Sequence, residues 1–169
     1  MSNPAAHTDN RVRPLRPADI DRIIAIDSGH VGEPRRRFFE KRLDHAEQHR
    51  EDFVHVGVTR DGVLVGFAFA RILRGEFGRE QATATLDAFG VERSNQDRGV
   101  GRALMNGLTE VMRRKGVQSL QSQADWTNHA LLRFFDASGF GLAPRLVLER
   151  SVLTPLAEPV EDERQRDKE

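Results

Sequence analysis

The sequence predicts an α/β chain with a mixed, mostly antiparallel, twisted central sheet of about seven strands flanked by about four helices. Three observations support this fold class. Apolar residues recur at helical spacing before residue 50, β-branched and aromatic runs follow from Phe53, and a strand-like run ending at Val91 leads through a glycine loop into a further helical pattern. Helical and strand patterns that alternate in this way are typical of a sheet covered by helices.

The N-terminal part predicts a short edge strand followed by two helices. Residues 12–15 form the strand, where Pro14 is tolerated because an edge position needs no donor. A helix starts at residues 17–19, and its apolar side is Ile20, Ile23 and Ile24. A second helix is expected from Pro34 to His49, with a charged outer face and with Phe38, Phe39, Leu43 and Ala46 directed inward.

The pattern changes to strands after the second helix. Asp61-Gly62 joins two apolar runs and is a strong hairpin signal. Basic residues and then Gly116 mark the end of the helix that follows the glycine loop. In order, we expect strands over 53–58, 63–70 and 82–91, that long helix, a strand over 117–124, a helix over 128–138 and a last strand over 146–153.

Composition indicates one domain in a chain of 169 residues with 38% hydrophobic content. We expect the domain over 11–153 and disordered ends over 1–10 and 154–169. Lysine plus arginine equals aspartate plus glutamate at 26 each, so no basic field predicts nucleic acid or a membrane as partner. Neither a membrane-spanning run nor a signal-peptide layout is evident, and we expect a cytoplasmic protein.

The chain has no cysteine. Disulfides, thiolate metal sites and a cysteine-linked acyl-enzyme are therefore excluded. His45 and His49 share a helix face, but the intervening Glu47 is out of place for a zinc-protease motif and no third ligand is evident. We expect no metal.

The glycine pair Gly99 and Gly101, at the start of a helix that follows a strand, is the most informative motif. The missing Cβ atoms let an anion approach the backbone, while the unpaired N–H groups at a helix start attract it. No Gly-Lys-Ser/Thr follows, and Ala103-Leu104 departs from G-x-G-x-x-G. The alternatives are a plain tight turn or an unrelated phosphate-binding domain, such as a nucleotide sensor that would bind ATP.

Two motifs resemble those of one family. Gln96-x-x-Gly99-x-Gly101 is similar to the pyrophosphate loop of the GNAT superfamily of N-acetyltransferases, and residues 128–140 are similar to its later motif, in which an Asn opens a helix ending at Gly-Phe. The resemblance spans residues 12–153. It implies a GNAT fold and direct transfer of an acetyl group from acetyl-CoA to a primary amine on a small molecule or a protein.

The resemblance also implies how the cofactor is bound. The strand before the loop splays from its neighbour and pairs with pantetheine, the loop binds the pyrophosphate, and residues of the later motif contact the cofactor arm. Carried over to this sequence, the cofactor-binding residues are Phe89, Gly90, Val91, Gln96, Asp97, Arg98, Gly99, Val100, Gly101, Arg102, Ala103, Asn128, Phe134 and Phe135.

An amine acceptor must lose a proton before it attacks a thioester, and in the family a carboxylate on or near this strand accepts that proton. Thr85 occupies the usual position of the family's glutamate, so Asp87 is a displaced substitute. Alternation along a strand predicts that Asp87 shares a face with Phe89. Glu76, in a probable surface loop, is the second candidate. A strand carboxylate that only pairs with an arginine is the alternative for Asp87.

The acid that protonates the leaving thiolate is commonly a tyrosine in this family. Phe135 occupies that position, and the chain contains no tyrosine. This departure supports a rival interpretation, a weak or inactive acyl-CoA-binding sensor. A CoA thiolate can also leave unprotonated, so turnover without the acid is compatible with the sequence.

The loop between the first two helices often borders the acceptor site in this family. The acceptor-binding candidates are Asp27, His30, Glu33, Arg35 and Trp126. The identity of the amine is left open, because acceptor pockets vary on a shared cofactor frame. Pairing of two copies through the last strand is also left open.

Overall fold

The computed structural model describes residues 9–78 and 80–153. Within them a sheet of five strands has the order β1-β2-β3-β4-β5, in which only β4 and β5 are parallel. The mixed, mostly antiparallel α/β fold is confirmed, with fewer strands than expected. The strands are β1 (Arg11–Pro14), β2 (Phe53–Arg60), β3 (Val63–Leu73), β4 (Thr83–Val91) and β5 (Ser119–Gln121).

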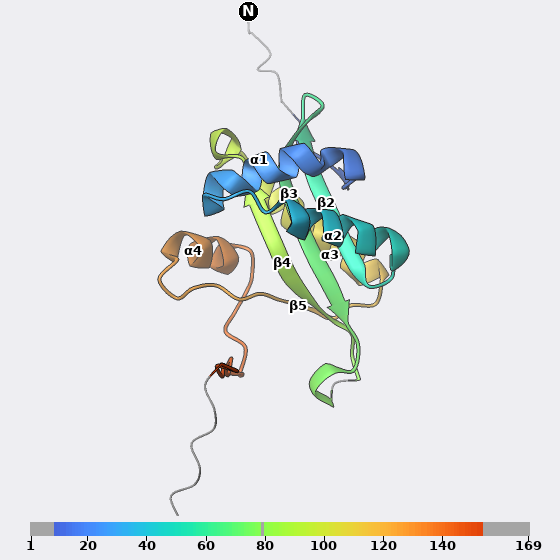
Figure 1. Cartoon of the computed structure of the whole chain (residues 1–169), viewed down its shortest axis with the longest axis vertical. Helices are drawn as coiled ribbons and strands as arrows, with labels where there is room; N and C mark the ends of the chain where they lie inside the picture. Colours follow the sequence, from blue (N-terminus) through green and yellow to red (C-terminus); the bar gives the residue numbers. More distant parts are fainter. Residues whose placement is uncertain (1–8, 79, 154–169) are drawn as a thin grey trace, which may run out of the picture.

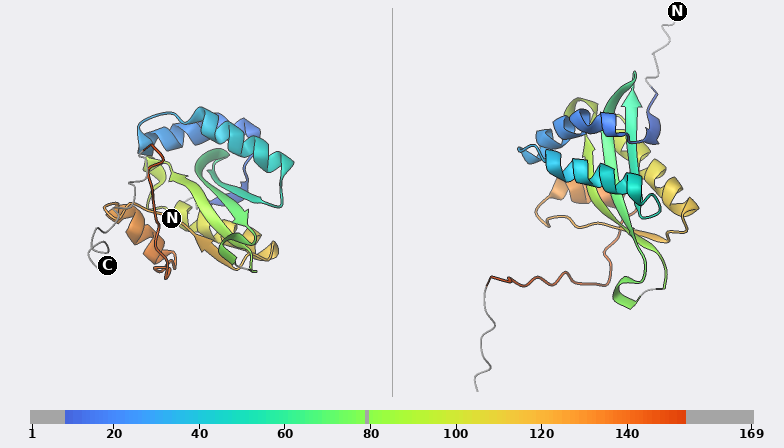
Figure 2. Two further views of the ribbon diagram at one scale, coloured as in Figure 1. Left: turned by 60° about the horizontal axis from the view of Figure 1, so that its bottom comes forward. Right: turned by 45° about the vertical axis from the view of Figure 1, so that its right-hand side comes forward.

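Helices cover both faces of the sheet (Figure 1). One face carries α1 (Ile20–Val31) and α2 (Arg36–Gln48), which enclose a core centred on Phe39, Phe67 and Phe69. The other face carries α3 (Val100–Arg114) and α4 (His129–Ala137), as the turned views of Figure 2 show. Short 3-10 turns occupy Pro17–Asp19, Glu76–Gly78 and Arg93–Asn95.

Local signals in the sequence place the turns and helix ends correctly. Asp61 and Gly62 both have positive φ, 51° and 79°, as a two-residue hairpin between antiparallel strands requires. Gly116 follows α3 at φ 73°, and the Asn128 side chain accepts from the Leu131 N–H at 3.1 Å and so caps α4.

A β-bulge at Asp87 changes the face to which β4 residues point. Ala70 pairs with Leu86 whereas Phe69 pairs with Ala88, so Asp87 is an extra residue in the ladder. Leu86 belongs to the core under α3, and Ala88 belongs to the core under α1 and α2. The prediction that Asp87 shares a face with Phe89 is therefore wrong, because simple alternation does not survive a bulge.

β4 and β5 separate soon after they pair. Their ladder covers only Thr83 to Thr85 of β4. The Glu92 N–H bonds to the Val65 carbonyl at 2.9 Å, and hydrogen-bonding direction alternates along an antiparallel strand. The backbone groups of Phe89 and Val91 consequently point away from β3, toward an edge that β5 does not cover.

The expected last strand over 146–153 is wrong. These residues form no ladder, and the chain after α4 runs away from the sheet (Figure 2). The pattern was apolar enough for a strand, but a strand exists only where a neighbour pairs with its backbone. Pairing of two protein copies through a last strand was left open, and among the described residues this strand is not formed. The exposed apolar side chains here include Leu146, Leu148 and Val152.

None of the described helices has both the length and the apolar character needed to cross a bilayer.

Candidate functional site

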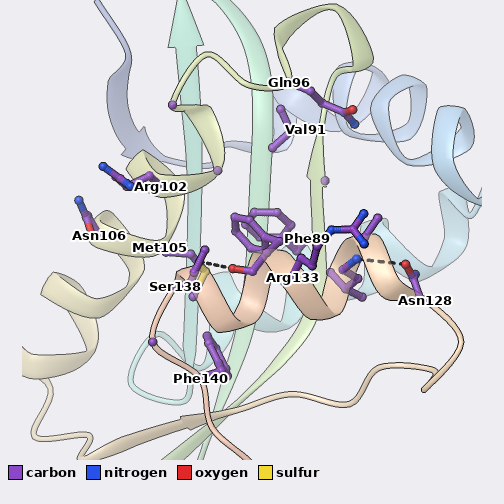
Figure 3. A pocket seen from close by; sticks show the side chains of 18 of the residues that line it. Phe89, Val91, Gln96, Arg102, Met105, Asn106, Asn128, Arg133, Ser138 and Phe140 are labelled. Carbon is purple, nitrogen blue, oxygen red and sulfur yellow. Dashed lines mark hydrogen bonds between the residues drawn. The ribbon is translucent and has the colours of Figure 1, made fainter.

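A cleft of about 1240 Å³ lies beside the open edge of β4 (Figure 3). Its walls come from the end of β4, the loop after it, one face of α3, and α4 with the turn that follows. The lining residues are His30, Val31, Phe89, Gly90, Val91, Gln96, Asp97, Gly99, Gly101, Arg102, Met105, Asn106, Thr109, Leu120, Asn128, Ala130, Leu131, Arg133, Phe134, Ala137, Ser138, Gly139, Phe140 and Gly141.

The loop from Gln96 to Gly101 presents backbone N–H groups to this cleft. Asp97 and Gly99 both have positive φ, 58° and 76°, which turns the chain sharply into α3. The first helical bond runs from Ala103 N–H to the Gly99 carbonyl, and among the described residues no side chain caps this helix start. The N–H groups of the first helical turn therefore remain available, at the positive end of the helix dipole, for an anion.

Contacts from distant parts of the chain hold the loop in place. The Asn10 side-chain N–H donates to the Arg98 carbonyl at 2.9 Å. At the start of the loop, Glu92 accepts from Arg22 and from Asn95, each at 2.7 Å, and the Arg22 hydrogen bond holds the pKa of Glu92 below its ordinary value. Asn10 thus belongs to the folded part, although disorder was expected over 1–10; residues 1–8 and 154–169 lie outside the described residues.

An aromatic pair lines the cleft directly beside Gly101 of the loop. The rings of Phe89 and Phe134 lie 4.8 Å apart, and Phe134 packs over the bare Cα of Gly101. A Cβ at Gly101 would lie 2.8 Å from a Phe134 ring carbon. The second glycine of the motif therefore makes room for this ring.

Ten of the residues expected to bind the cofactor line the cleft, and four do not. Val100 and Phe135 are buried in the core, and Ala103 packs against it. Arg98 contributes its carbonyl to Asn10 and does not line the cleft. Gly90 is in the lining, but the space of its missing side chain is filled by Phe67, at 2.8 Å from an added Cβ, so close packing accounts for this glycine.

The sequence reading missed the contribution of α3 beyond its first turn. Met105 and Thr109 follow Gly101 at intervals of four, and Asn106 follows Arg102 by four, so all of them face the cleft. Helical spacing from the motif glycine was a signal that could have identified them. Arg133, Ser138 and Phe140 of the α4 region were missed as well (Figure 3).

Asp87 lies on the other face of β4, in a charged cluster. Its carboxylate contacts Arg42 of α2 at 3.1 Å and Arg71 of β3 at 3.0 Å, and its side chain is 9% exposed. Glu76 is exposed in a turn between β3 and β4, at the end of these strands remote from the glycine loop. Of the two carboxylates, only Asp87 lies where β4 leaves β5.

The five residues expected to touch the acceptor do not form one site, although two of them pair with each other. Asp27 is buried and forms a two-point ion pair with Arg35, at 2.5 and 2.8 Å, which joins α1 to α2. His30 lines the cleft, where its Nε2 lies 2.7 Å from the Val91 carbonyl. Glu33 is exposed, and Trp126 is 83% exposed.

One group of side chains has the spacing of metal ligands. Ligand atoms of His49, Glu51 and Asp52 lie within 4.8 Å of one another on the surface after α2. Asp52 already binds the guanidinium of Arg74. A cation would have to compete with that positive charge.

Comparison with known proteins identifies the family. Residues 21–140 match the Acetyltransferase (GNAT) family. The chain belongs to this GNAT family. The resemblance in the two sequence motifs is thereby confirmed. Similar curated proteins include the ribosomal protein bS18-alanine N-acetyltransferase of Escherichia coli (strain K12), 26% identical over 98 residues, which are 58% of this chain and 62% of the relative.

A second curated relative of this GNAT protein is the mycothiol acetyltransferase of Propionibacterium freudenreichii subsp. shermanii. It is 26% identical over 137 residues, which cover 78% of this chain and 43% of the relative. The matched stretches thus span less than two thirds of both relatives.

Solved structures share the GNAT fold. Aminoglycoside N-acetyltransferase AAC(6')-Iy in complex with CoA superposes with a TM-score of 0.75 at 18% identity, over 88% of this chain and 98% of the other. A ribosomal-protein-alanine N-acetyltransferase from Brucella melitensis gives 0.67 at 17% identity, over 85% and 99%. At these identities the likeness concerns the fold alone.

Proposed function

We propose that this protein transfers an acetyl group from acetyl-CoA to a primary amine, directly and within a ternary complex. The observation that carries the proposal is the combination, in one cleft, of the uncovered β4 edge with the free amides that start α3. The pyrophosphate of CoA binds these amides, and pantetheine pairs with Phe89 and Val91 as an added strand. The residues present suit this cofactor, because both backbone surfaces open into the same cleft.

The chemistry requires one proton acceptor and one good leaving group. The neutral amine nitrogen attacks the thioester carbonyl, a C–N bond forms, the C–S bond breaks and CoA leaves as thiolate. We assign acceptance of the amine proton to Asp87, directly or through water, because it lies where β4 opens and Glu76 does not. Water protonates the thiolate, since Phe135 replaces the usual tyrosine and is buried.

A second function, an acyl-CoA sensor without turnover, is favoured by the contacts of Asp87. Its carboxylate already binds two guanidinium groups, so a substrate amine would have to displace one of them or share an oxygen. Both functions require CoA binding. Only the enzyme releases free CoA when an amine is added.

The deciding experiment measures CoA release with a thiol reagent over a panel of amines. The absence of cysteine from the chain means that the protein itself contributes no thiol signal. Acetyl-CoA is first shown to raise the melting temperature, as a ligand of the folded state must. Amine-dependent CoA release supports the transferase. Stabilisation by acetyl-CoA with no release for any amine supports the sensor, and stabilisation by ATP alone contradicts both.

A further inference from the structure

The charged cluster around Asp87 contains more positive than negative groups. Among the salt bridges of the described residues, Asp87 is the one carboxylate paired with two arginines, Arg42 and Arg71. The buried pair of Asp27 with Arg35 has one arginine for one acid. Two guanidinium groups on one carboxylate leave a net charge of about +1 at this position.

The nearby histidine does not alter this balance. Burial, and next the positive charge of Arg42, lower the pKa of His55 to about 3. His55 is therefore neutral at neutral pH. It adds no charge to the cluster and offers no second anion to the arginines.

Both arginines keep hydrogen-bond donors that Asp87 does not use. Arg71 donates from Nε and Nη2, and Arg42 contacts Asp87 through Nη1. The Arg42 guanidinium is held over the Phe38 ring at 5.2 Å, and the side chains of Arg42 and Arg71 are 22% and 41% exposed. Neither side chain is fully buried, and unused guanidinium donors of this kind bind a carboxylate well.

The cluster is also close to the predicted path of the cofactor. Asp87 precedes Phe89 by two residues, which corresponds to about 7 Å along a strand. Phe89 opens to the cleft on one face, and the bulge directs Asp87 to the other. An acceptor bound to the cluster on the α2 face would therefore meet the thioester at the part of β4 that is no longer paired with β5.

We propose that the acceptor is a zwitterionic amine, such as a free amino acid, whose carboxylate binds Arg42 and Arg71 while its amino group faces Asp87. This inference deepens the proposed function and rests on it. In the form that reacts, with a neutral amine and an ionised carboxylate, such an acceptor carries one negative charge, which balances the surplus positive charge of the cluster. A polycationic acceptor such as an aminoglycoside would leave the surplus arginine charge unmatched and would be repelled by it.

The test compares each common L-amino acid with its α-carboxamide, which keeps the amine and lacks the negative charge. With acetyl-CoA and wild-type protein, we expect at least one amino acid to release CoA with a kcat/KM ten or more times that of its amide. Arg71→Gln should raise the KM for that amino acid at least tenfold and lower its kcat/KM far more than that of its amide, while the affinity for acetyl-CoA stays within about twofold. The matched control is Arg36→Gln on α2, whose partners Asp21 and Glu40 lie outside the cluster.

Binding is measured in parallel, so the outcome does not depend on turnover. Calorimetry with CoA present should detect the preferred amino acid and lose it in Arg71→Gln. The inference is overturned if amides or polyamines are acetylated as well as amino acids, if Arg71→Gln weakens acid and amide equally, or if no amino acid binds. Failure of the transferase proposal looks different, because amino acids then bind without any release of CoA.

Discussion

The two faces of β4 present different kinds of recognition surface. Toward α3 and α4 the strand offers backbone groups, the glycine loop and the aromatic pair Phe89 and Phe134. Toward α2 it offers a charged cluster in which Asp87 binds two arginines. Both surfaces belong to one nine-residue strand, because the bulge at Asp87 changes the face to which the following side chains point.

This difference suggests how one fold can bind the same cofactor in all its members while the acceptor varies. A surface made of main-chain amides is kept by any sequence that preserves the glycines and the splayed strands. A surface made of side chains from α2, β3 and β4 changes with single substitutions. We therefore expect variants on the cofactor side to alter acetyl-CoA affinity, and variants on the Asp87 side to alter turnover and acceptor choice.

The largest expected effect comes from Asp87→Asn. The amide keeps the shape of the side chain but cannot accept the amine proton at neutral pH. We expect kcat to fall by about 10²-fold or more, the usual contribution of a positioned base. The dissociation constant for acetyl-CoA should stay within about twofold, since Asp87 is not part of the cleft lining.

Glu76→Gln is the matched control for this prediction. Glu76 is the other carboxylate considered as base, and its exposed position remote from the loop predicts near wild-type kcat. Initial rates of CoA release at saturating substrate measure both variants. A loss of kcat in Glu76→Gln with normal turnover in Asp87→Asn would reverse the assignment.

On the cofactor side, Gly101→Val should weaken acetyl-CoA binding about tenfold or more, the equivalent of one charge-assisted hydrogen bond. The new Cβ would lie 2.8 Å from a Phe134 ring carbon, so the ring must shift while the added methyl groups cover the amides. Calorimetric titration with acetyl-CoA measures the change.

Gly116→Ala provides the comparison for Gly101→Val. It strains the other end of α3 at φ 73° without any neighbour within 4 Å of the new Cβ. It should cost about 1 kcal/mol of stability and leave acetyl-CoA affinity unchanged. Equal loss of affinity in both variants would mean that the integrity of the helix, rather than its first turn, determines binding.

What the sequence predicted depends less on the face of β4 than on whether a feature arises from neighbouring or from distant residues. The glycine loop, the α3 start and the Asn128 cap depend on neighbouring residues, so local motifs found them. The bulge at Asp87 depends on how β3 and β4 pair, and the Asn10 contact joins residues 88 positions apart. Neither has a local signal.

The same reason explains the expected strand over 146–153. Its apolar pattern is real, but a pattern supplies no partner, and these residues pair with nothing in the described structure. The cluster of Asp87 with Arg42 and Arg71 likewise comes from three elements. Sequence reasoning raised an arginine partner for Asp87 as the alternative, but without the fold it could not say which arginines or how many.

A smaller effect, on stability, should come from His55 on the charged side. The pKa of His55 is lowered from 6.5 to about 3 in the folded protein, first by burial and then by Arg42. Between these values the unfolded chain binds the proton and the folded chain does not, so stability is lost as pH falls below about 6.5. The slope from this group is at most about 1.4 kcal/mol per pH unit.

Removal of the titrating ring measures that contribution. His55→Gln should flatten the dependence of the free energy of unfolding on pH between about 6 and 4, as followed by urea denaturation at a series of pH values. The variant also loses the contact of the ring with Phe69 at 4.2 Å, so its stability at neutral pH is lower than that of the wild type. An unchanged slope would show that the pKa of His55 is not lowered on folding.

The smallest predicted change in stability concerns Asn128. This residue has two possible roles, capping α4 and contacting the cofactor, which two variants can separate. Its side-chain oxygen caps α4 through the Leu131 N–H, and the residue also lines the cleft. Asn128→Ala should cost about 1 kcal/mol of stability. Asn128→Asp keeps the capping oxygen but lacks the amide N–H and adds a negative charge. If acetyl-CoA affinity falls in both variants, the residue acts on the cofactor directly and not only through the position of α4. If it falls only in Asn128→Ala, the residue acts by holding α4, and with it Phe134, against the loop.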